Sequence, residues 1–302
     1  MTSSLITPCP AIGFHCGAGD GPKGTKLGPF LTTLRTRLPL TAAQIFISSP
    51  TSFAHCSWLP STCKAINTYV TTHKIRLFVH APYIMNPCTD DTSVIHGLLV
   101  NILHTAATMG AEGVVIHVGK SLKLGEPEGL RRMRIFVDGV LAATAATGKP
   151  AARLLIETCA GQGTEVARDL NVFGAFVKEV VATHGAERVG ACVDTCHVFA
   201  CGYRIGTLAE TVGSVIGWEN VHLIHLNDSK TECGKRVDRH ECIGHGKIGK
   251  AELGAFCSDV ASAAPHAAFI FETPDVDDDG VTRTAEFAWF HSLFASTATD
   301  SL

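Results

Sequence analysis

The sequence lacks the features that would direct a chain into or through a membrane. Its N-terminus, MTSSLITPCPAIGFHCG, has no basic segment followed by a long apolar one, so we do not expect a secretory signal. No stretch approaches about 18 uninterrupted apolar residues, which argues against a membrane-spanning helix. We expect an intracellular, non-secreted protein without membrane contact. The sequence expresses no preference between cytoplasm and nucleus.

Charge is also scarce, because only 18% of the 302 residues are charged and 25 Lys and Arg face 28 Asp and Glu. The formal net charge of -3 taken alone argues against nucleic-acid binding, since surfaces that bind nucleic acid are usually basic. The hydrophobic share of 46% excludes a disordered chain and suffices for one large core.

Eight short apolar runs alternate with longer amphipathic segments. They are AIGFHCG, AQIFISSP, IRLFVHAP, GVVIHVG, RLLIETCAGQG, VGACVDTCH, VHLIHLND and AAFIFETP. Between two of them, SVIHGLLVNILHTAATMG has helical spacing and ends at Gly110, a suitable C-cap. Eight strands alternating with helices predict an α/β fold, a (β/α)8 TIM barrel, as a single domain over residues 1–302. A doubly wound open sheet is the main rival. The polar tail ASTATDSL and the N-terminal tail are expected to be disordered.

Six of these runs end in a side chain that can bind a metal ion. In a parallel barrel the carboxyl ends of all strands open onto one face, so these side chains should converge there. They are His80, His117, Glu157, Asp194, His225 and Glu272.

Two local motifs add further candidates to this face. His197 follows Asp194 by three residues, and Asp238 and His240 lie two residues apart, which places both on one side of an extended loop. The total of five His and four carboxylates suits three metal ions with one bridging carboxylate. His and carboxylate favour zinc, with manganese or iron as alternatives at one site. Three Zn²⁺ with four carboxylates leave a site of about +2, which weakens the objection from net charge.

Other conspicuous residues receive plainer interpretations. His15 ends the first run, and ligand or hydrogen-bonded neighbour are equally good interpretations. GHGKIG at 244–249 fits the GxGxxG pattern but follows no strand, so its glycines are expected to form tight turns beside the site. Arg131, Arg132 and Arg134 are expected on a solvated helix face. The twelve cysteines are interpreted as reduced thiols, with Cys192, Cys196 and Cys201 packing near the site; an isolated disulfide stays open.

The same segments carry a family resemblance. IETCAGQG, VDTCHVFACGY, HLNDSK, RVDRHECIGHGKIG and FETP resemble stretches of the endonuclease IV family of apurinic/apyrimidinic endonucleases, over residues 11 to 293. The resemblance implies hydrolysis of the phosphodiester 5′ to an abasic site in double-stranded DNA, leaving a 3′-hydroxyl and a 5′-deoxyribose phosphate. Trimming of blocked 3′ ends is an additional activity that it leaves open.

The resemblance also implies a role for each candidate residue. His80 and His117 would bind a first zinc, and Glu157 would bridge it to a second. The second zinc would be completed by Asp194, His225 and Glu272, and a third would be held by His197, Asp238 and His240. Glu157, Glu272 and Asp238 are the carboxylates implied to take part in catalysis.

DNA contacts are implied for the loops after the second and third strands. Tyr83 and Ile84 stand where family members insert a wedge into the gap left by the flipped-out nucleotide. Thr51 stands where the family usually has arginine, and Phe53 where it usually has tryptophan, which puts tight DNA binding in doubt. A metal-dependent sugar isomerase-like barrel and a non-catalytic binder of damaged DNA are the alternative functions. We expect a monomer.

Overall fold

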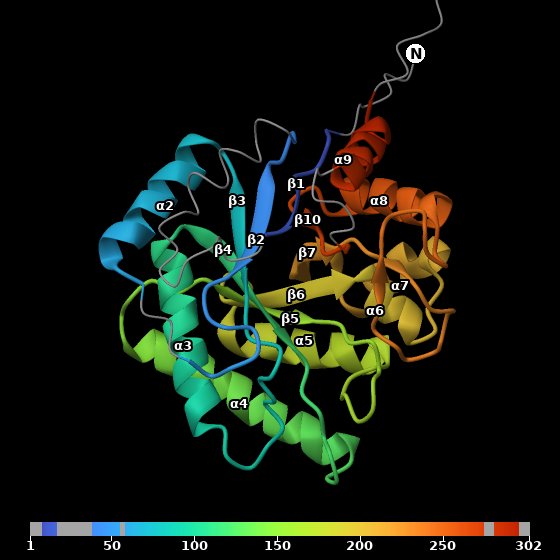
Figure 1. The fold of residues 1–302 in the computed structure, drawn as a ribbon. Helices are drawn as coiled ribbons and strands as arrows, with labels where there is room; N and C mark the ends of the chain where they lie inside the picture. Colours follow the sequence, from blue (N-terminus) through green and yellow to red (C-terminus); the bar gives the residue numbers. More distant parts are fainter. Residues whose placement is uncertain (1–7, 17–37, 55–57, 275–280, 296–302) are drawn as a thin grey trace, which may run out of the picture.

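Eight parallel strands close into a barrel in the order β1-β10-β7-β6-β5-β4-β3-β2 (Figure 1). This computed structural model describes residues 8–16, 38–54, 58–274 and 281–295, so the two tails expected to be disordered lie outside the described residues. The closed order confirms the (β/α)8 barrel and excludes the open doubly wound sheet. The strands are β1 (Ile12–Cys16), β2 (Ala42–Phe46), β3 (Arg76–His80), β4 (Ala111–His117), β5 (Arg153–Glu157), β6 (Val189–Asp194), β7 (Val221–His225) and β10 (Ala268–Phe271).

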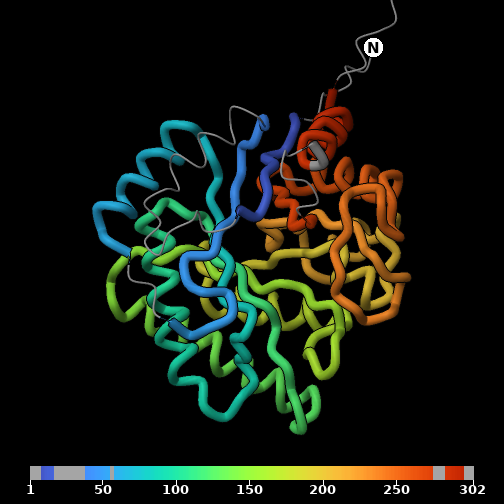
Figure 2. Tube along the Cα trace, in the orientation of Figure 1, coloured from blue at the N-terminus to red at the C-terminus, as the bar shows by residue number. Residues whose placement is uncertain are grey.

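Helices surround the barrel, as the trace in Figure 2 shows. The described helices are α2 (Pro60–Thr72), α3 (Ser93–Thr108), α4 (Glu126–Ala146), α5 (Leu170–His184), α6 (Thr195–Ala200), α7 (Leu208–Val215), α8 (Lys250–Ala263) and α9 (Val281–Ser292), with 3-10 turns η1 (Ile205–Thr207) and η2 (Trp218–Asn220). The expected helix before β4 is α3, and Gly110 follows its C-cap at φ 78°. Within the described part of the chain, none of these helices combines the length and apolarity that crossing a bilayer requires.

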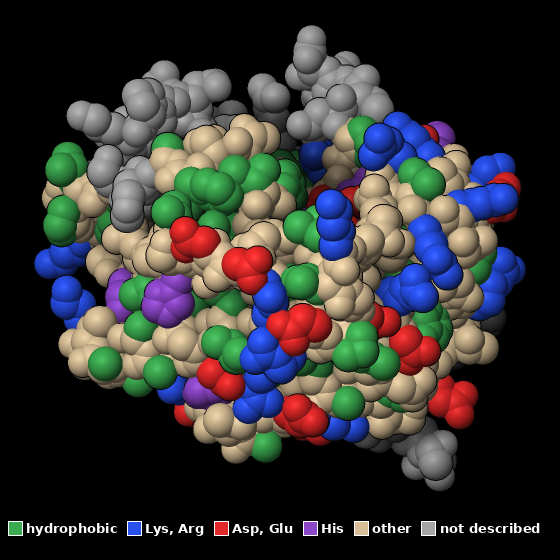
Figure 3. Space-filling model, turned by 90° about the horizontal axis from the view of Figure 1, so that it is seen from below, with side chains coloured by type: hydrophobic (Ala, Val, Ile, Leu, Met, Phe, Trp, Pro, Cys, Tyr) green, Lys and Arg blue, Asp and Glu red, His purple; other side chains and the backbone are tan. Residues whose placement is uncertain are grey.

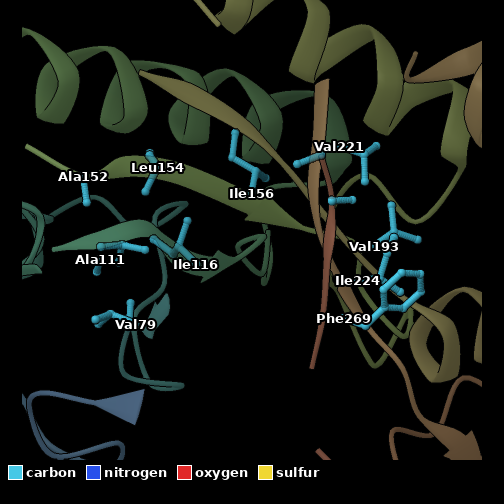
Figure 4. Packing of buried hydrophobic residues seen from close by; sticks show 14 of the residues in the cluster. Val79, Ala111, Ile116, Ala152, Leu154, Ile156, Val193, Val221, Ile224 and Phe269 are labelled. Carbon is cyan, nitrogen blue, oxygen red and sulfur yellow. The ribbon is translucent and has the colours of Figure 1, made fainter. Parts of the chain in front are cut away.

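The core has two layers because strand side chains alternate between the two faces of the barrel wall. Outward-facing residues such as Val79, Ile156 and Ile224 pack between the wall and the helices (Figure 4). Inward-facing residues fill the barrel itself: Ala42, Phe78, Val115, Leu155, Cys192, Leu223, Ala268 and Ile270. Most strands therefore contribute to both layers.

Glycine is required where β1 passes β2. A Cβ atom placed on Gly13 would lie 1.8 Å from the carbonyl oxygen of Ala42, far inside contact distance. Any side chain at this position would push the two strands apart and open the barrel.

A small antiparallel pair lies in the long connection between β7 and α8. It is formed by β8 (Asp228–Ser229) and β9 (His240–Glu241), with Ser229 opposite His240. The sequence pattern did not predict this pair. It fixes the position of His240 at the carboxyl end of the barrel.

Candidate metal centre

On their strands, the candidate ligands are the next inward-facing residues after those that fill the barrel core, toward the carboxyl end. His80 follows the interior residue Phe78 by two positions, Glu157 follows Leu155, and His225 follows Leu223, so each continues the inward-facing row of its strand. These side chains are almost completely buried. The barrel interior thus changes from apolar to ionisable at its carboxyl end.

A first group of donors is formed by His80, His117 and Glu157. The Nε2 atoms of His80 and His117 lie 3.3 Å and 3.0 Å from Oε2 of Glu157. The other oxygen, Oε1, lies 2.8 Å from Nδ1 of His225. Glu157 therefore stands between this group and the next.

A second group contains Glu157, Asp194, His225 and Glu272, whose donor atoms all lie within 4.8 Å of one another. Nδ1 of His225 is 3.1 Å from Oε2 of Glu272 and 3.8 Å from Oδ2 of Asp194. Three carboxylates around one imidazole are a donor set suited to a divalent cation.

A third group joins His197 on α6 with Asp238 and His240 from the connection between β7 and α8. Asp238 places Oδ2 3.3 Å from Nε2 of His197 and Oδ1 3.1 Å from Nε2 of His240. The carboxylate of Asp194 also approaches this group, with Oδ2 3.7 Å from Nε2 of His240. Asp194 caps α6 by accepting the backbone N–H of His197 at 2.8 Å, which explains why it lies between the second and third groups.

The donors in these groups fit metal ions. Among the described residues, Oε2 of Glu157 and Nε2 of His197 and His240 are buried without a partner in hydrogen-bonding geometry. Leaving such buried groups unsatisfied costs about 1–3 kcal/mol each, and ligation of a cation would satisfy them. Imidazole and carboxylate donors at this density suit zinc and related divalent ions.

The ionisation of the cluster reflects its mutual contacts. Burial alone lowers the pKa of His225, but Cys192, Glu272 and Glu157 together raise that pKa well above its usual range. Burial opposes the same change in His240, whose pKa Asp194 and Asp238 nevertheless raise to about 9. Binding of cations to this cluster would therefore displace protons from these imidazoles.

Two further residues that sequence reasoning did not assign as ligands support the second group. Gln44, 0% exposed, accepts from Nε2 of His225 at 2.9 Å and donates Nε2–H to Oε1 of Glu272 at 2.8 Å. Its contact fixes the proton of His225 on Nε2 and leaves Nδ1 facing the carboxylates. His15 lies against Gln44 at 2.9 Å and Glu272 at 3.1 Å, and thus touches one candidate ligand. The position of Gln44 could have indicated this role, because it follows Ala42 by two residues in β2 and therefore also points into the barrel.

Asp228 organises the glycine-rich segment at 244–249. Its carboxylate accepts backbone N–H groups of Gly244, Gly246, Ile248 and Gly249 at 2.9 to 3.4 Å. A Cβ on Gly246 would meet Asp228 Oδ1 at 2.4 Å. The segment therefore forms tight turns around a buried carboxylate beside the site, as the sequence analysis expected. Its backbone N–H groups donate to Asp228, whereas those of a nucleotide-binding loop donate to phosphate.

A cavity of about 510 Å³ opens above the three groups. Figure 3 shows a hollow near the upper centre of this face, with red and purple side chains in its depth. Candidate ligands share its wall with residues that the sequence did not single out. These additional lining residues are Lys120, Gln162, Glu165, Thr273 and Arg283.

Of the candidate DNA-contact residues, Tyr83 lines this cavity, and the others lie on the same two loops. Tyr83 is 49% exposed and its ring centroid lies 5.1 Å from that of His80, while Ile84 is 41% exposed. Thr51 and Phe53 are exposed in the loop after β2. The two loops meet where the Tyr83 N–H donates to the Pro50 carbonyl at 3.0 Å.

Two cysteine thiols that were interpreted as packing residues also approach the donor groups. The thiol of Cys192 lies within 4.8 Å of donor atoms of Glu157 and His225, and that of Cys196 lies within 4.8 Å of donor atoms of Asp238 and His240. Cys192 and Cys196 are buried, and Cys201 is partly buried. Arg131 and Arg132 form ion pairs with Glu128 on α4, and Arg134 pairs with Asp138, so this cluster belongs to the helix surface.

Comparison with known proteins agrees with the barrel fold. The xylose isomerase-like TIM barrel family matches residues 37–293. A probable endonuclease 4 of Staphylococcus carnosus is 32% identical over 212 residues, which cover 67% of this chain and 68% of the relative. The crystal structure of endonuclease IV from Thermus thermophilus superposes with a TM-score of 0.79 at 27% identity, covering 94% of this chain and 100% of the other.

The chain belongs to the endonuclease IV family. It is accordingly an enzyme of the nuclease class within the xylose isomerase-like barrels. A D-tagatose 3-epimerase-like protein, 14% identical with a TM-score of 0.69, covers 94% of this chain and 98% of its own. At that identity the likeness shows the fold alone.

Proposed function

We propose that this endonuclease IV family member, acting as one domain and a monomer, hydrolyses the DNA phosphodiester 5′ to an abasic site with the help of three zinc ions. The observation that carries the proposal is the convergence of three donor groups, linked through Glu157 and Asp194, at the floor of one cavity. A sugar isomerase that uses one or two metal ions has no need of the third group, and a non-catalytic DNA binder has no need of any of the three.

The residues divide among three metal positions. His80, His117 and Glu157 would hold the first ion, and Glu157 with Asp194, His225 and Glu272 the second. His197, Asp238 and His240 would hold the third, with Asp194 alongside. Bound there, the ions supply Lewis-acid polarisation of a phosphoryl group. Glu157, Glu272 and Asp238 would hold these ions, and a phosphate entering the cavity would then meet a preorganised centre.

Other residues of the chain bind and orient the substrate. Tyr83 and Ile84 are exposed apolar side chains at the rim and would fill the space vacated by the extruded abasic nucleotide. Lys120 lines the same cavity with its ammonium group 3.8 Å from the Glu165 carboxylate, and it would offer that group to a phosphate oxygen. Thr51, also at the rim, supplies at most a hydroxyl where a cation would bind more tightly.

The basic surface missing from the overall composition is concentrated beside the site. The segment 230–250, which carries Asp238 and His240, also carries six cationic side chains: Lys230, Lys235, Arg236, Arg239, Lys247 and Lys250. Its carboxylates are Glu232, Asp238 and Glu241, and Lys247 and Lys230 lie 3.1 Å and 4.0 Å from Glu232 and Glu241. The segment thus keeps an excess of positive charge. In Figure 3 blue side chains gather on the right, the side where Figure 1 shows α7 and α8. A duplex can therefore approach along this segment although the chain is acidic overall.

The test is incision of a duplex that contains tetrahydrofuran, an abasic analogue that resists β-elimination. The zinc-loaded protein should nick it on the 5′ side, and a chelator should abolish the nick. Glu157→Gln should reduce incision by at least about a hundredfold, because it removes the charge that joins two ions. Glu112→Gln, at the other end of the barrel wall and paired with Arg76, is the matched control and should incise normally.

Binding without nicking by the zinc-loaded protein would favour the damaged-DNA binder. One manganese or magnesium ion per chain with no zinc would favour the sugar isomerase. Full activity of Glu157→Gln would refute the bridging role.

A further inference from the structure

Two cysteines lie against each other beside the candidate metal centre. Cys159 follows Glu157 by two residues in the loop after β5, and Cys201 is the C-cap residue of α6, the helix that carries His197. The Cys201 thiol donates to the carbonyl oxygen of Cys159 at 3.1 Å. The Cys159 thiol donates to the carbonyl oxygen of Val166 at 3.5 Å. The Cys201 sulfur therefore lies against the backbone of Cys159, and each thiol donates to a carbonyl oxygen in the reduced protein.

Access differs between these thiols and the other cysteines nearby. Cys201 is partly exposed, whereas Cys159 is 6% exposed and Cys192 and Cys196 are completely buried. A Cβ on Gly161 would lie 3.0 Å from Cys201 Sγ, and the left-handed φ of 73° favours glycine there, so no side chain covers the thiol from this position. A small oxidant from solvent therefore reaches Cys201 before the other three.

We propose that Cys159 and Cys201 form a redox modification site, which a hydroperoxide converts into an intramolecular disulfide. The Cys201 sulfur attacks hydrogen peroxide, breaks its O–O bond and becomes a sulfenic acid with release of water. The Cys159 sulfur then displaces the hydroxyl group, which leaves with the thiol proton as a second water. Two thiols are oxidised by two electrons and one peroxide is reduced. A dithiol reverses the reaction by exchange.

The disulfide would alter the position of a candidate ligand. A disulfide bond of about 2.05 Å requires both thiols to leave the carbonyl oxygens of Val166 and Cys159 and to turn toward each other. Thr158 precedes Cys159, and its carbonyl oxygen lies 2.8 Å from Nδ1 of His197. Drawing the β5 loop toward α6 displaces that carbonyl and with it the imidazole. This expectation rests on the proposed function. The oxidised enzyme should incise DNA about tenfold more slowly, which is the smallest loss typical when a metal ligand loses an outer hydrogen-bond partner.

The experiment treats the zinc-loaded full-length protein with hydrogen peroxide, blocks remaining thiols and digests with trypsin. Cys159 lies in the peptide 154–168 and Cys201 in the peptide 189–204, which also contains Cys192 and Cys196. We expect the two peptides joined with the loss of two hydrogens, and fragment spectra that place the link on Cys201. Cys159→Ser and Cys201→Ser should each abolish the link, and Cys233→Ser, a partly buried thiol on another loop, should preserve it.

Absence of the link in wild type, or a link through Cys192 or Cys196, would overturn the modification site. Slower incision that a dithiol restores, and that neither serine variant shows, would support its effect on the enzyme. A link that leaves incision unchanged would support the site and overturn that effect. The link is read by mass spectrometry, so a protein that never incises would refute the proposed function without deciding the disulfide.

Discussion

Replacing Gln44 by leucine should weaken metal binding without disturbing the barrel. Gln44 is buried in the inward-facing row of β2, next above Ala42, and contacts the second group of donors from below. Leucine has a similar volume and suits the apolar layer beneath. The substitution removes the acceptor for Nε2 of His225 and the donor to Oε1 of Glu272.

The magnitude follows from these two lost contacts. Loss of an outer partner that orients a metal ligand typically lowers metal affinity by about 10- to 100-fold. That range corresponds to about 1.4–2.7 kcal/mol of binding free energy. His225 is the larger contributor, because without Gln44 its proton is no longer fixed on Nε2 and its ring is free to present the wrong nitrogen.

The assay is competition for zinc with a chromophoric chelator, followed by thermal unfolding with and without zinc. Gln44→Leu should show weaker zinc binding and a smaller rise in melting temperature on zinc addition. Asn220→Leu is the control, because Asn220 is a buried amide at the opposite end of the barrel that donates to the Ile216 carbonyl at 2.8 Å. It should lower stability and leave zinc affinity unchanged. Wild-type affinity in Gln44→Leu, or equal losses in both variants, would refute the orienting role.

Two further results are expected. Zinc binding should release protons at pH 7 and become tighter as the pH rises toward 9. Burial lowers the pKa of His225, but Cys192, Glu272 and Glu157 raise it well above its usual range, and the pKa of His240 is raised to about 9. Both imidazoles must lose a proton to bind zinc, so a higher pH favours binding. Calorimetry in buffers of different ionisation enthalpy measures the release, and a buffer-independent heat would contradict it. In the double variant Lys235→Ala, Lys247→Ala, the slope of the logarithm of the duplex-binding constant against the logarithm of salt concentration should become shallower by about 0.9 per lost phosphate contact. Arg131→Ala, on the outer face of α4, should leave this slope unchanged. Equal slopes for the wild type and the double variant would show that the 230–250 segment does not contact DNA.

The sequence predicted what is set by local alternation, and not what depends on pairing across the loops. Each barrel strand was visible as an apolar run, and each run that ends in His, Asp or Glu placed that side chain at the carboxyl rim. The β8–β9 pair was not visible, because its strands are two residues each. Asp228 was missed for a similar reason: apart from Ser229, its amide partners lie 16 to 21 residues away. Gln44 was missed because only His, Asp and Glu at the carboxyl ends of the strands were considered as candidate site residues, and an amide was not.

The placement of the candidate ligands one step above the packed interior ties the site to strand register. Ala42, Phe78, Leu155 and Leu223 lie inside the barrel only while the residues two positions later also point inward. Sliding any of these strands by one residue would turn its polar end toward the helices and bring a bulky aliphatic group into the mouth. A misregistered chain would thus lose its core and its chemistry together. Selection for a stable barrel wall therefore also preserves the orientation of the candidate ligands at its carboxyl end.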